Sequence, residues 1–389
     1  MRYPRAVQVE RLARHVRHRP LEVFCSAPEG GRVARVFDSA SDIVVTRIPA
    51  SPLARVFETL APSRRDVVHT LDAALYWWKR AAGCIADACV PKRSDVLVTF
   101  GQPMADHLAG LRLKRDFGMI WIAHFSDPWA DNPFLTSSLA RRRARKLEAK
   151  VIAAADALVF TSPETVELVM SKYPGEWRRK AHVLPHAFEP ALYAGQKPMG
   201  DKLTLRYLGN FYGNRGPEPL YRALLFLRER APELFKRIRV ELVGNMSSRH
   251  RQSSALARLP PETVRISPPV AYRESLSLMK SADLLLSIDA PFENSVFLPS
   301  KLVDYIGAGR PILGITPPGT AARVIRELGG WVAHPDNAEE IAAAIKTALD
   351  GAEANRGAPW GSPGVRADYA APRVAARFES IVNSLFSAV

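Results

Sequence analysis

Cysteine and long apolar segments are scarce in this 389-residue chain. The three cysteines, Cys25, Cys84 and Cys89, cannot all form disulfides and lack the spacing of a metal site, so they fit a reducing compartment. No apolar run approaches the roughly 18 residues of a membrane-spanning helix, and the N-terminal residues lack the hydrophobic core of a signal peptide. We therefore expect a cytoplasmic protein, with peripheral contact at the inner face of the membrane as a second candidate location.

Two common nucleotide-binding signatures are also missing. The sequence has no Gly-x-x-x-x-Gly-Lys-Ser/Thr, which argues against a P-loop nucleotidase. It has no complete Gly-x-Gly-x-x-Gly, which disfavours NAD chemistry. A nucleotide site in this chain would have to be built from other loops.

Basic residues are abundant. Lys and Arg number 54 against 39 Asp and Glu, which gives a formal charge of +15 and a pI near 10.0. Such a balance indicates an anionic partner, which could be nucleic acid, an anionic bilayer or a phosphorylated substrate. Charge alone does not choose among the three.

Length and pattern predict two α/β domains. A chain of 389 residues is long enough for two separate cores, and short apolar strands alternate with helical patterns in both halves. Strands are predicted at 21–25, 43–48, 95–100, 119–123, 157–161, 182–185, 203–208, 239–243, 264–266, 284–288, 312–315 and 330–332. Helices are predicted at 5–18, 70–90, 139–155, 163–172, 219–230, 273–281, 338–349 and 373–386, with a loop at 351–364.

One predicted helix start has the features of an anion site. It lies in Phe297 to Ile315, FLPSKLVDYIGAGRPILGI, where Pro299 stops the preceding segment and Ser300 is placed to cap the first turn. First-turn amides, the positive end of the helix dipole and Lys301 together suit a phosphate. Asp304 is placed to accept hydrogen bonds from sugar hydroxyls. The alternative is a plain surface helix with Lys301 and Asp304 as an i,i+3 pair.

A second stretch, Tyr207 to Arg215 (YLGNFYGNR), also has features of an anion site. A strand runs into a Gly/Asn loop, where Gly209 allows close approach of a ligand to the backbone and Arg215 offers a forked donor for phosphate oxygens. Arg215 and Lys301 are far apart in the sequence, so no local helix pairing explains both. A shared anionic ligand would explain the presence of both cations.

Together these two stretches resemble the C-terminal half of the family 4 glycosyltransferases, and the resemblance covers most of the chain. It implies the α/β GT-B fold, in which two Rossmann-like, doubly wound domains face a central cleft. It also implies that Gly209, Arg215 and Lys301 hold the pyrophosphate of a donor and that Asp304 holds its ribose. The donor-binding set expected from the resemblance is Gly209, Asn210, Arg215, Val270, Ser300, Lys301, Leu302 and Asp304, with Val270 near the nucleotide base.

The same resemblance implies transfer of a sugar from a nucleotide-diphosphate sugar with retention of anomeric configuration. No Asp-x-Asp triplet, the usual metal clamp of the other main glycosyltransferase fold, is present, so we expect neither metal nor cofactor. Cations and helix dipoles would stabilise the departing diphosphate. Many family members carry two glutamates flanking seven residues; here Asp304 takes the second position, but Val296 takes the first. The chain therefore departs from the family at contacts to the transferred sugar.

The expected partners are a nucleotide-sugar donor and a glycan, lipid-linked or small-molecule acceptor. An anionic membrane surface is a further candidate, and nucleic acid is not expected. The acceptor would meet the loop after strand 119–123, where His124 and Asp127 are the catalytic candidates. The alternatives are that Asp127 caps the next turn and that His124 is satisfied by a backbone carbonyl.

The resemblance also predicts the domain limits. Residues 1–190 form the acceptor-side domain, 191–202 a linker, 203–370 the nucleotide-sugar domain, and 371–389 a helix that crosses back. The strand that normally opens the first domain is absent before the helix at 5–18. Either the chain starts downstream of its natural start or the domain lacks this strand. We favour the first alternative, because a parallel sheet without an inner strand would expose apolar surface.

Two surface patterns bear on the membrane. Trp77 and Trp78 beside Lys79 and Arg80 are typical of an interfacial anchor, although one buried and one half-covering tryptophan is the commoner outcome. The basic run at 141–146 is either a solvated helix face or a contact for membrane or acceptor phosphate.

Two other functions fit the same fold. A sugar-nucleotide 2-epimerase would need several acidic and histidine residues in the cleft, and few are seen. A catalytically silent GT-B module that binds an anionic surface or a partner is kept open by Val296 and by the missing first strand.

Overall fold

The computed structural model describes residues 4–18, 20–27, 34–38, 43–49, 76–135, 137–193, 201–354 and 358–387. The chain divides into two compact units. The first comprises Met1–Leu12 and His186–Val374, and the second comprises Ala13–Pro185 and Ala375–Val389. The N-terminal segment thus groups with the C-terminal half, unlike the division predicted from the sequence. Residues 194–200 of the predicted linker and 70–75 of the predicted helix at 70–90 lie outside the described residues.

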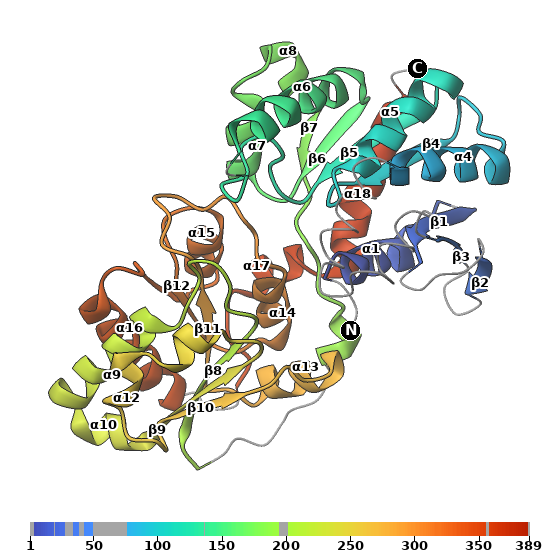
Figure 1. The fold of residues 1–389 in the computed structure, drawn as a ribbon. Helices are drawn as coiled ribbons and strands as arrows, with labels where there is room; N and C mark the ends of the chain where they lie inside the picture. Colours follow the sequence, from blue (N-terminus) through green and yellow to red (C-terminus); the bar gives the residue numbers. More distant parts are fainter. Residues whose placement is uncertain are drawn as a thin grey trace. The chain divides into compact units, whose positions relative to one another are not determined.

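The first unit contains a six-stranded parallel sheet in the order β10-β9-β8-β11-β12-β13 (Figure 1). Its strands are β8 (Leu203–Leu208), β9 (Ile238–Val243), β10 (Val264–Ser267), β11 (Leu284–Ile288), β12 (Ile312–Ile315) and β13 (Trp331–Ala333). All six were predicted from the sequence to within about two residues.

Helices in this unit follow the strands. They are α9 (Glu218–Arg230), α10 (Pro232–Arg237), α11 (Ser248–Arg251), α12 (Ser254–Ala257), α13 (Tyr272–Lys280), α14 (Ser300–Ala308), α15 (Thr320–Glu327), α16 (Ala338–Ala354) and α17 (Pro363–Asp368). A 3-10 turn, η3 (Pro190–Tyr193), precedes them. The predicted loop at 351–364 is wrong at both ends, because α16 continues into it and α17 begins within it. Two helices, α1 (Pro4–His15) and α18 (Ala371–Phe386), are each divided between the two units.

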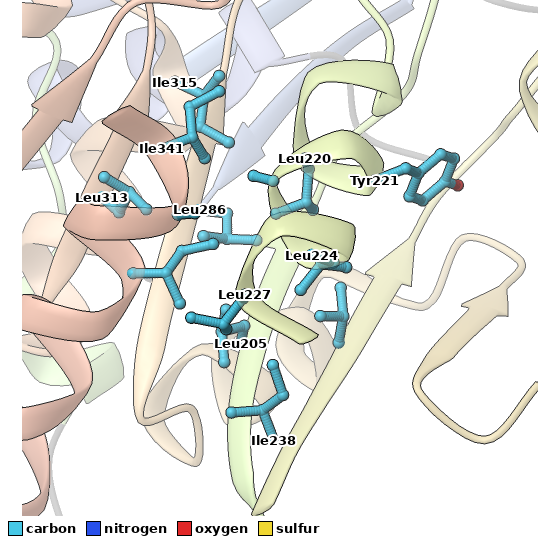
Figure 2. Packing of buried hydrophobic residues seen from close by; sticks show 14 of the residues in the cluster. Leu205, Leu220, Tyr221, Leu224, Leu227, Ile238, Leu286, Leu313, Ile315 and Ile341 are labelled. Atoms are coloured by element: carbon cyan, nitrogen blue, oxygen red, sulfur yellow. The ribbon is translucent and has the colours of Figure 1, made fainter. Parts of the chain in front are cut away.

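Successive side chains of each strand point to opposite faces of this sheet, and the apolar ones form a core on each face. In β8, Leu205 packs in a cluster with Leu220 and Leu224 of α9, and Figure 2 shows these side chains meeting Leu286 of β11. On the opposite face, Leu208 joins a cluster with residues of α13, α14 and α15. Because both faces are covered, the strands read in the sequence as nearly continuous apolar runs.

The strand order determines where a ligand loop can open. In chain order the sheet runs 3-2-1-4-5-6, so β8 pairs with both β9 and β11, and the connections leave in opposite directions from these two neighbours. Open α/β sheets bind ligands outside the carboxyl ends of the strands at this switch point. The loops after β8 and β11 are therefore the positions of interest.

The second unit contains two smaller sheets. The order is β1-β3-β2 in one and β4-β5-β6-β7 in the other, and the latter is parallel throughout. The strands are β1 (Leu21–Ser26), β2 (Ala34–Asp38), β3 (Ile43–Ile48), β4 (Val96–Phe100), β5 (Ile120–Phe125), β6 (Ala157–Phe160) and β7 (Ala181–Val183). The helices are α4 (Trp78–Cys89), α5 (Ala105–Phe117), α6 (Ser138–Ala154), α7 (Pro163–Met170) and α8 (Gly175–Arg178).

Several details of this unit differ from the sequence predictions. Strand β2 and helix α5 were not predicted. Strand β5 continues two residues beyond its predicted end, so His124 lies inside the strand. Trp77 is buried and its indole Nε1 donates to Asp106 (2.5 Å), while Trp78 is partly buried against the same core. The tryptophan pair therefore follows the packing alternative. None of the described helices has both the length and the apolar character needed to cross a membrane.

A close backbone approach at the carboxyl edge of the first unit's sheet supplies a stability prediction. Gly244, just after β9, has φ +149°, and a Cβ there would lie 1.8 Å from the Gly209 carbonyl oxygen. Gly244→Ala should lower the free energy of unfolding by about 1–3 kcal/mol or more. Gly364→Ala is the matched control, because nothing lies within 4 Å of its Cβ position and alanine favours the helix. Denaturant unfolding that affects both variants equally would contradict this reading.

Candidate nucleotide-sugar site

The loop after β8 is tied to two neighbouring elements. The Leu208 amide donates to the Tyr305 hydroxyl of α14 (2.9 Å), which fixes the end of β8 against that helix. The Asn245 amide donates to Asn210 Oδ1 (2.9 Å), which joins the loop to the end of β9. Asn210 therefore holds the loop in shape. A Cβ on Gly209 would lie 2.8 Å from the Tyr207 hydroxyl, so glycine suits the first loop position.

Arg215 reaches across the switch point. Its Nη2 donates to Asp289 Oδ1 (2.8 Å), directly after β11, and its guanidinium lies 5.1 Å from the centre of the Tyr212 ring. The Thr316 hydroxyl donates to the other oxygen of Asp289 (2.9 Å). Burial works to lower the pKa of Arg215, but attraction to Asp289 and the Tyr212 and Tyr207 hydroxyls outweighs it and raises the pKa. Arg215 is thus a positioned cation with one donor already engaged.

The start of α14 differs from its prediction in one respect. Pro299 is the N-cap residue and no side chain caps the helix, so the predicted capping role of Ser300 is wrong. Ser300 is instead the first helical residue. Gly309 ends the helix at φ +61°, a left-handed conformation that glycine adopts readily. The side chain of Leu302 is fully buried in the core, so only its backbone faces the first turn.

Lys301 is the most accessible charged group at this helix start. Its side chain is 39% exposed, and its Nζ lies 4.0 Å from Asp304 Oδ2 and 5.7 Å from the centre of the Tyr272 ring. Burial lowers the pKa of Lys301, opposed by the charge of Asp304 and reinforced by that of Arg11. The i,i+3 pair with Asp304 exists, but at the longest distance that counts as an ion pair.

Asp304 is buried and already has several donors. Its Oδ1 accepts from Arg11 Nη2 (2.8 Å), from the Tyr193 hydroxyl (3.0 Å) and from the Tyr272 hydroxyl (3.2 Å). These donors come from α1, η3 and α13. Desolvation and the Asp304 charge raise the pKa of both tyrosines, which keeps them as donors. The predicted ribose acceptor is therefore the centre of an internal polar cluster.

Nothing in the sequence pattern indicated Arg11 as a site residue. Its guanidinium donates to Asp304 and Tyr272, and to the Ala187 carbonyl (2.5 Å). Burial acts to lower its pKa, but the charge of Asp304 and the tyrosine hydroxyls raise it. The helical pattern of the sequence indicated only on which face of the helix Arg11 lies. A partner 293 residues away leaves no local signal.

His186 lies near the same cluster. It is partly buried, and desolvation together with the charges of Arg5 and Arg11 lowers its pKa to about 3. It is therefore neutral at physiological pH. Val270, expected near the nucleotide base, is partly buried against the core beside α13.

The catalytic candidates of the second unit are placed differently from each other. His124 is buried in β5, with its ring 5.0 Å from that of Phe100 and its carbonyl accepting from the Gly101 amide (2.7 Å). Asp127 follows the strand and is partly exposed. The sequence interpretation missed His107, a fully buried residue of α5 that bonds the Thr99 hydroxyl (2.8 Å), and a Cβ on Gly101 would lie 2.7 Å from its Nε2.

Metal-ligating side chains do not gather in the part of the chain that the structure describes. No group of three or more His, Cys, Asp or Glu there could hold a metal ion.

Comparison with known proteins gives a fold but no sequence family. No family model matches the chain, and no curated protein matches its sequence. Solved structures match over nearly the whole chain. A trehalose-6-phosphate synthase studied for glycosyltransfer with retention has a TM-score of 0.67 at 14% identity, covering 93% of each chain.

Two further structures are similar. Sucrose-phosphate synthase from Thermosynechococcus elongatus has a TM-score of 0.68 at 16% identity, covering 99% of this chain and 94% of that one. Anabaena HepE, in complex with UDP-glucose, has a TM-score of 0.62 at 15% identity, covering 89% and 87%. The chain therefore has the GT-B type of α/β fold, as predicted, and resembles retaining nucleotide-sugar glycosyltransferases in structure.

The Arg11–Asp304 pair supplies a stability prediction. Arg11→Gln leaves the buried Asp304 carboxylate without its nearer cation, with only the long contact to Lys301 remaining, and should cost about 3–5 kcal/mol of unfolding free energy. Arg323→Gln, which breaks an exposed pair with Glu327, should cost less than about 0.5 kcal/mol. The double variant Arg11→Gln/Asp304→Asn should be more stable than the sum of the single losses. Strict additivity in denaturant unfolding would show that the two residues do not depend on each other.

His186 supplies a prediction about pH. Its pKa in the folded protein is about 3, against about 6.5 when unfolded, so the unfolded state takes up the proton first as pH falls. This residue should therefore remove stability progressively below about pH 6.5. His186→Gln should show a shallower loss of melting temperature than wild type between about pH 6.5 and 4. Parallel curves for the two proteins would exclude a buried neutral histidine.

Proposed function

We propose that this chain is a retaining, metal-independent glycosyltransferase of the family 4 type that uses a nucleotide-diphosphate sugar. One observation carries the proposal: two cation-bearing elements open at the switch point of a 3-2-1-4-5-6 parallel sheet. They are the loop after β8 with Arg215 and the start of α14 with Lys301, linked through the Leu208–Tyr305 hydrogen bond. This is where open α/β sheets bind nucleotides.

The charges at this edge suit a diphosphate. Asp289 engages one nitrogen of Arg215, which leaves the rest of the fork for phosphate oxygens. Lys301 is partly exposed and has only a long contact to Asp304. The lowered pKa of Lys301 reflects the cost of burying its charge, and a bound diphosphate would offset that cost. In the reaction, both cations and the α14 dipole would stabilise negative charge as it builds on the leaving diphosphate.

Asp304 would act through its second oxygen. Oδ1 is saturated by three donors, so a ribose hydroxyl would have to donate to Oδ2, on the side of Lys301. The other proposed donor contacts are the Gly209–Asn210 backbone, the first-turn backbone of Ser300 and Leu302, and Val270 near the base. The Leu302 amide would have to exchange its hydrogen bond to the Pro299 carbonyl (3.0 Å) for one to the ligand.

The acceptor is proposed to meet the second unit, which holds most of the acceptor-side domain that the sequence placed at residues 1–190. Asp127, partly exposed after β5, is the better placed of the two catalytic candidates, and buried His124 would act from within the strand. A glycan, lipid-linked or small-molecule acceptor is consistent with this assignment. The UDP-glucose held by HepE makes UDP-hexoses the first donors to try.

A functional prediction follows for the two cations. Arg215→Ala and Lys301→Ala should each lower the rate of nucleoside diphosphate release by about a hundredfold or more, the scale for losing one preorganised charge-stabilising donor. Lys346→Ala is the control, since its ion pair with Asp350 lies on the surface of α16. Calorimetry with UDP should show weaker binding for the double variant. Normal UDP binding by that variant would remove the basis of the proposal.

The same assays separate the alternatives. A silent binding module would bind UDP without releasing it from any donor in a panel of nucleotide sugars. A 2-epimerase would instead convert UDP-N-acetyl sugars without needing an acceptor. Only acceptor-dependent release of the diphosphate supports the transferase.

A further inference from the structure

Helix α6 of the second unit carries a one-sided row of cations. Leu139, Arg142, Arg143, Lys146 and Lys150 are exposed and recur at helical spacing, and we call the four cations among them the basic stripe. Arg141 and Arg145 are also exposed but lie closer to the buried face. The opposite face is buried and consists of Ala144, Glu148, Val151 and Ile152. The helix thus packs on its unit by one face and turns the basic stripe to solvent.

The basic stripe does not serve the helix that carries it. Arg142, Lys146 and Lys150 are successive like-charged i,i+4 neighbours, which destabilise a helix. Several of its cations lie in the first half of α6, and its first turn has no acidic residue, the reverse of what the helix dipole favours. The helix's one acid, Glu148, is buried and engaged by Lys172 (2.7 Å). Among the described residues the basic stripe has no ion-pair partner.

Two large apolar side chains are exposed at the start of the same helix. Leu139 is 76% exposed and Phe134 is 51% exposed. A turn holds Phe134 in place: the Leu135 amide donates to the Asn132 carbonyl (2.9 Å), and Arg141 Nη2 donates to the Leu135 carbonyl (2.8 Å). Apolar tips beside uncompensated cations therefore belong to one short segment.

We propose that the basic stripe, with Phe134 and Leu139, is a docking surface for an anionic lipid bilayer. A helix that presents cations and apolar groups together lies in the interface, with its charges among anionic headgroups and its apolar side chains inserted below them. Nucleic acid is the less suitable polyanion, because a phosphodiester backbone gives no reason to expose a leucine and a phenylalanine. The surface goes beyond the proposed transferase activity and does not depend on it.

Vesicle co-sedimentation of the full chain tests this surface. Wild type should bind phosphatidylglycerol-containing vesicles at low salt but not pure phosphatidylcholine, and should be released at about 1 M salt, where the Debye length is about 3 Å. The variant Arg142→Gln/Arg143→Gln/Lys146→Gln/Lys150→Gln should bind at least about tenfold more weakly. Leu139→Ser, which keeps every charge, should also bind more weakly.

The control removes the same charge elsewhere. Arg230, Arg237, Arg323 and Lys346 are surface cations of the first unit, each with an acidic partner, and their fourfold change to glutamine should leave vesicle binding near wild type. Circular dichroism should show unchanged folding for both fourfold variants, because every altered residue lies at the surface. Equal weakening in the two variants would reduce the effect to net charge and overturn the proposal. Absence of binding to anionic vesicles, or tighter binding to duplex DNA that the same stripe variant abolishes, would overturn it as well.

Discussion

A buried carboxylate without water must find its hydrogen-bond donors within the protein, and Asp304 imposes this requirement on the first unit. Its three short contacts come from α1, η3 and α13, which are distant in the sequence. One of these donors, Arg11, also donates to the Ala187 carbonyl. Three segments, namely α1, η3 and α13, are therefore held around one charge. This accounts for the grouping of the N-terminal residues with the C-terminal half.

Positive charge is of two kinds in this protein. In the first unit, two cations at the sheet have acidic partners: Arg206 bonds Glu241 within the strands, and Arg215 bonds Asp289 at the switch point. Such pairs are oriented and only partly hydrated, so they can direct a ligand without contributing to a long-range field. The four cations of the basic stripe on α6 are exposed and have no ion-pair partner among the described residues, and part of the net charge of +15 resides there. A single count of basic residues hides this difference.

The sequence predicted the first unit's sheet well, because each of its strands is buried on both faces and reads as a short apolar run. It also placed Arg215 in a loop after a strand and Lys301 at a helix start, because both contexts are local; their role in binding stays a prediction. It could not predict Arg11 or Tyr193, whose common partner Asp304 lies 293 and 111 residues away in the sequence. Ser300 was misassigned for a smaller reason, since the helix begins at Ser300, one residue earlier than a capping serine at this position requires.

That misassignment changes how the start of α14 should be understood. Elsewhere in the chain, helices such as α6, α7, α12 and α17 have a serine whose side chain accepts from the first-turn amides. In the first unit, α9, α13, α14 and α15 lie after strands of the sheet, and none has a side-chain cap. In a capped helix, the first-turn amides donate to a side chain of the same protein. In an uncapped helix, first-turn amides without an intrahelical partner can donate to solvent or to an anion. The lack of a serine cap on α14 therefore leaves more of its first turn for the phosphate that we propose to bind there, although the Leu302 amide already donates to the Pro299 carbonyl (3.0 Å).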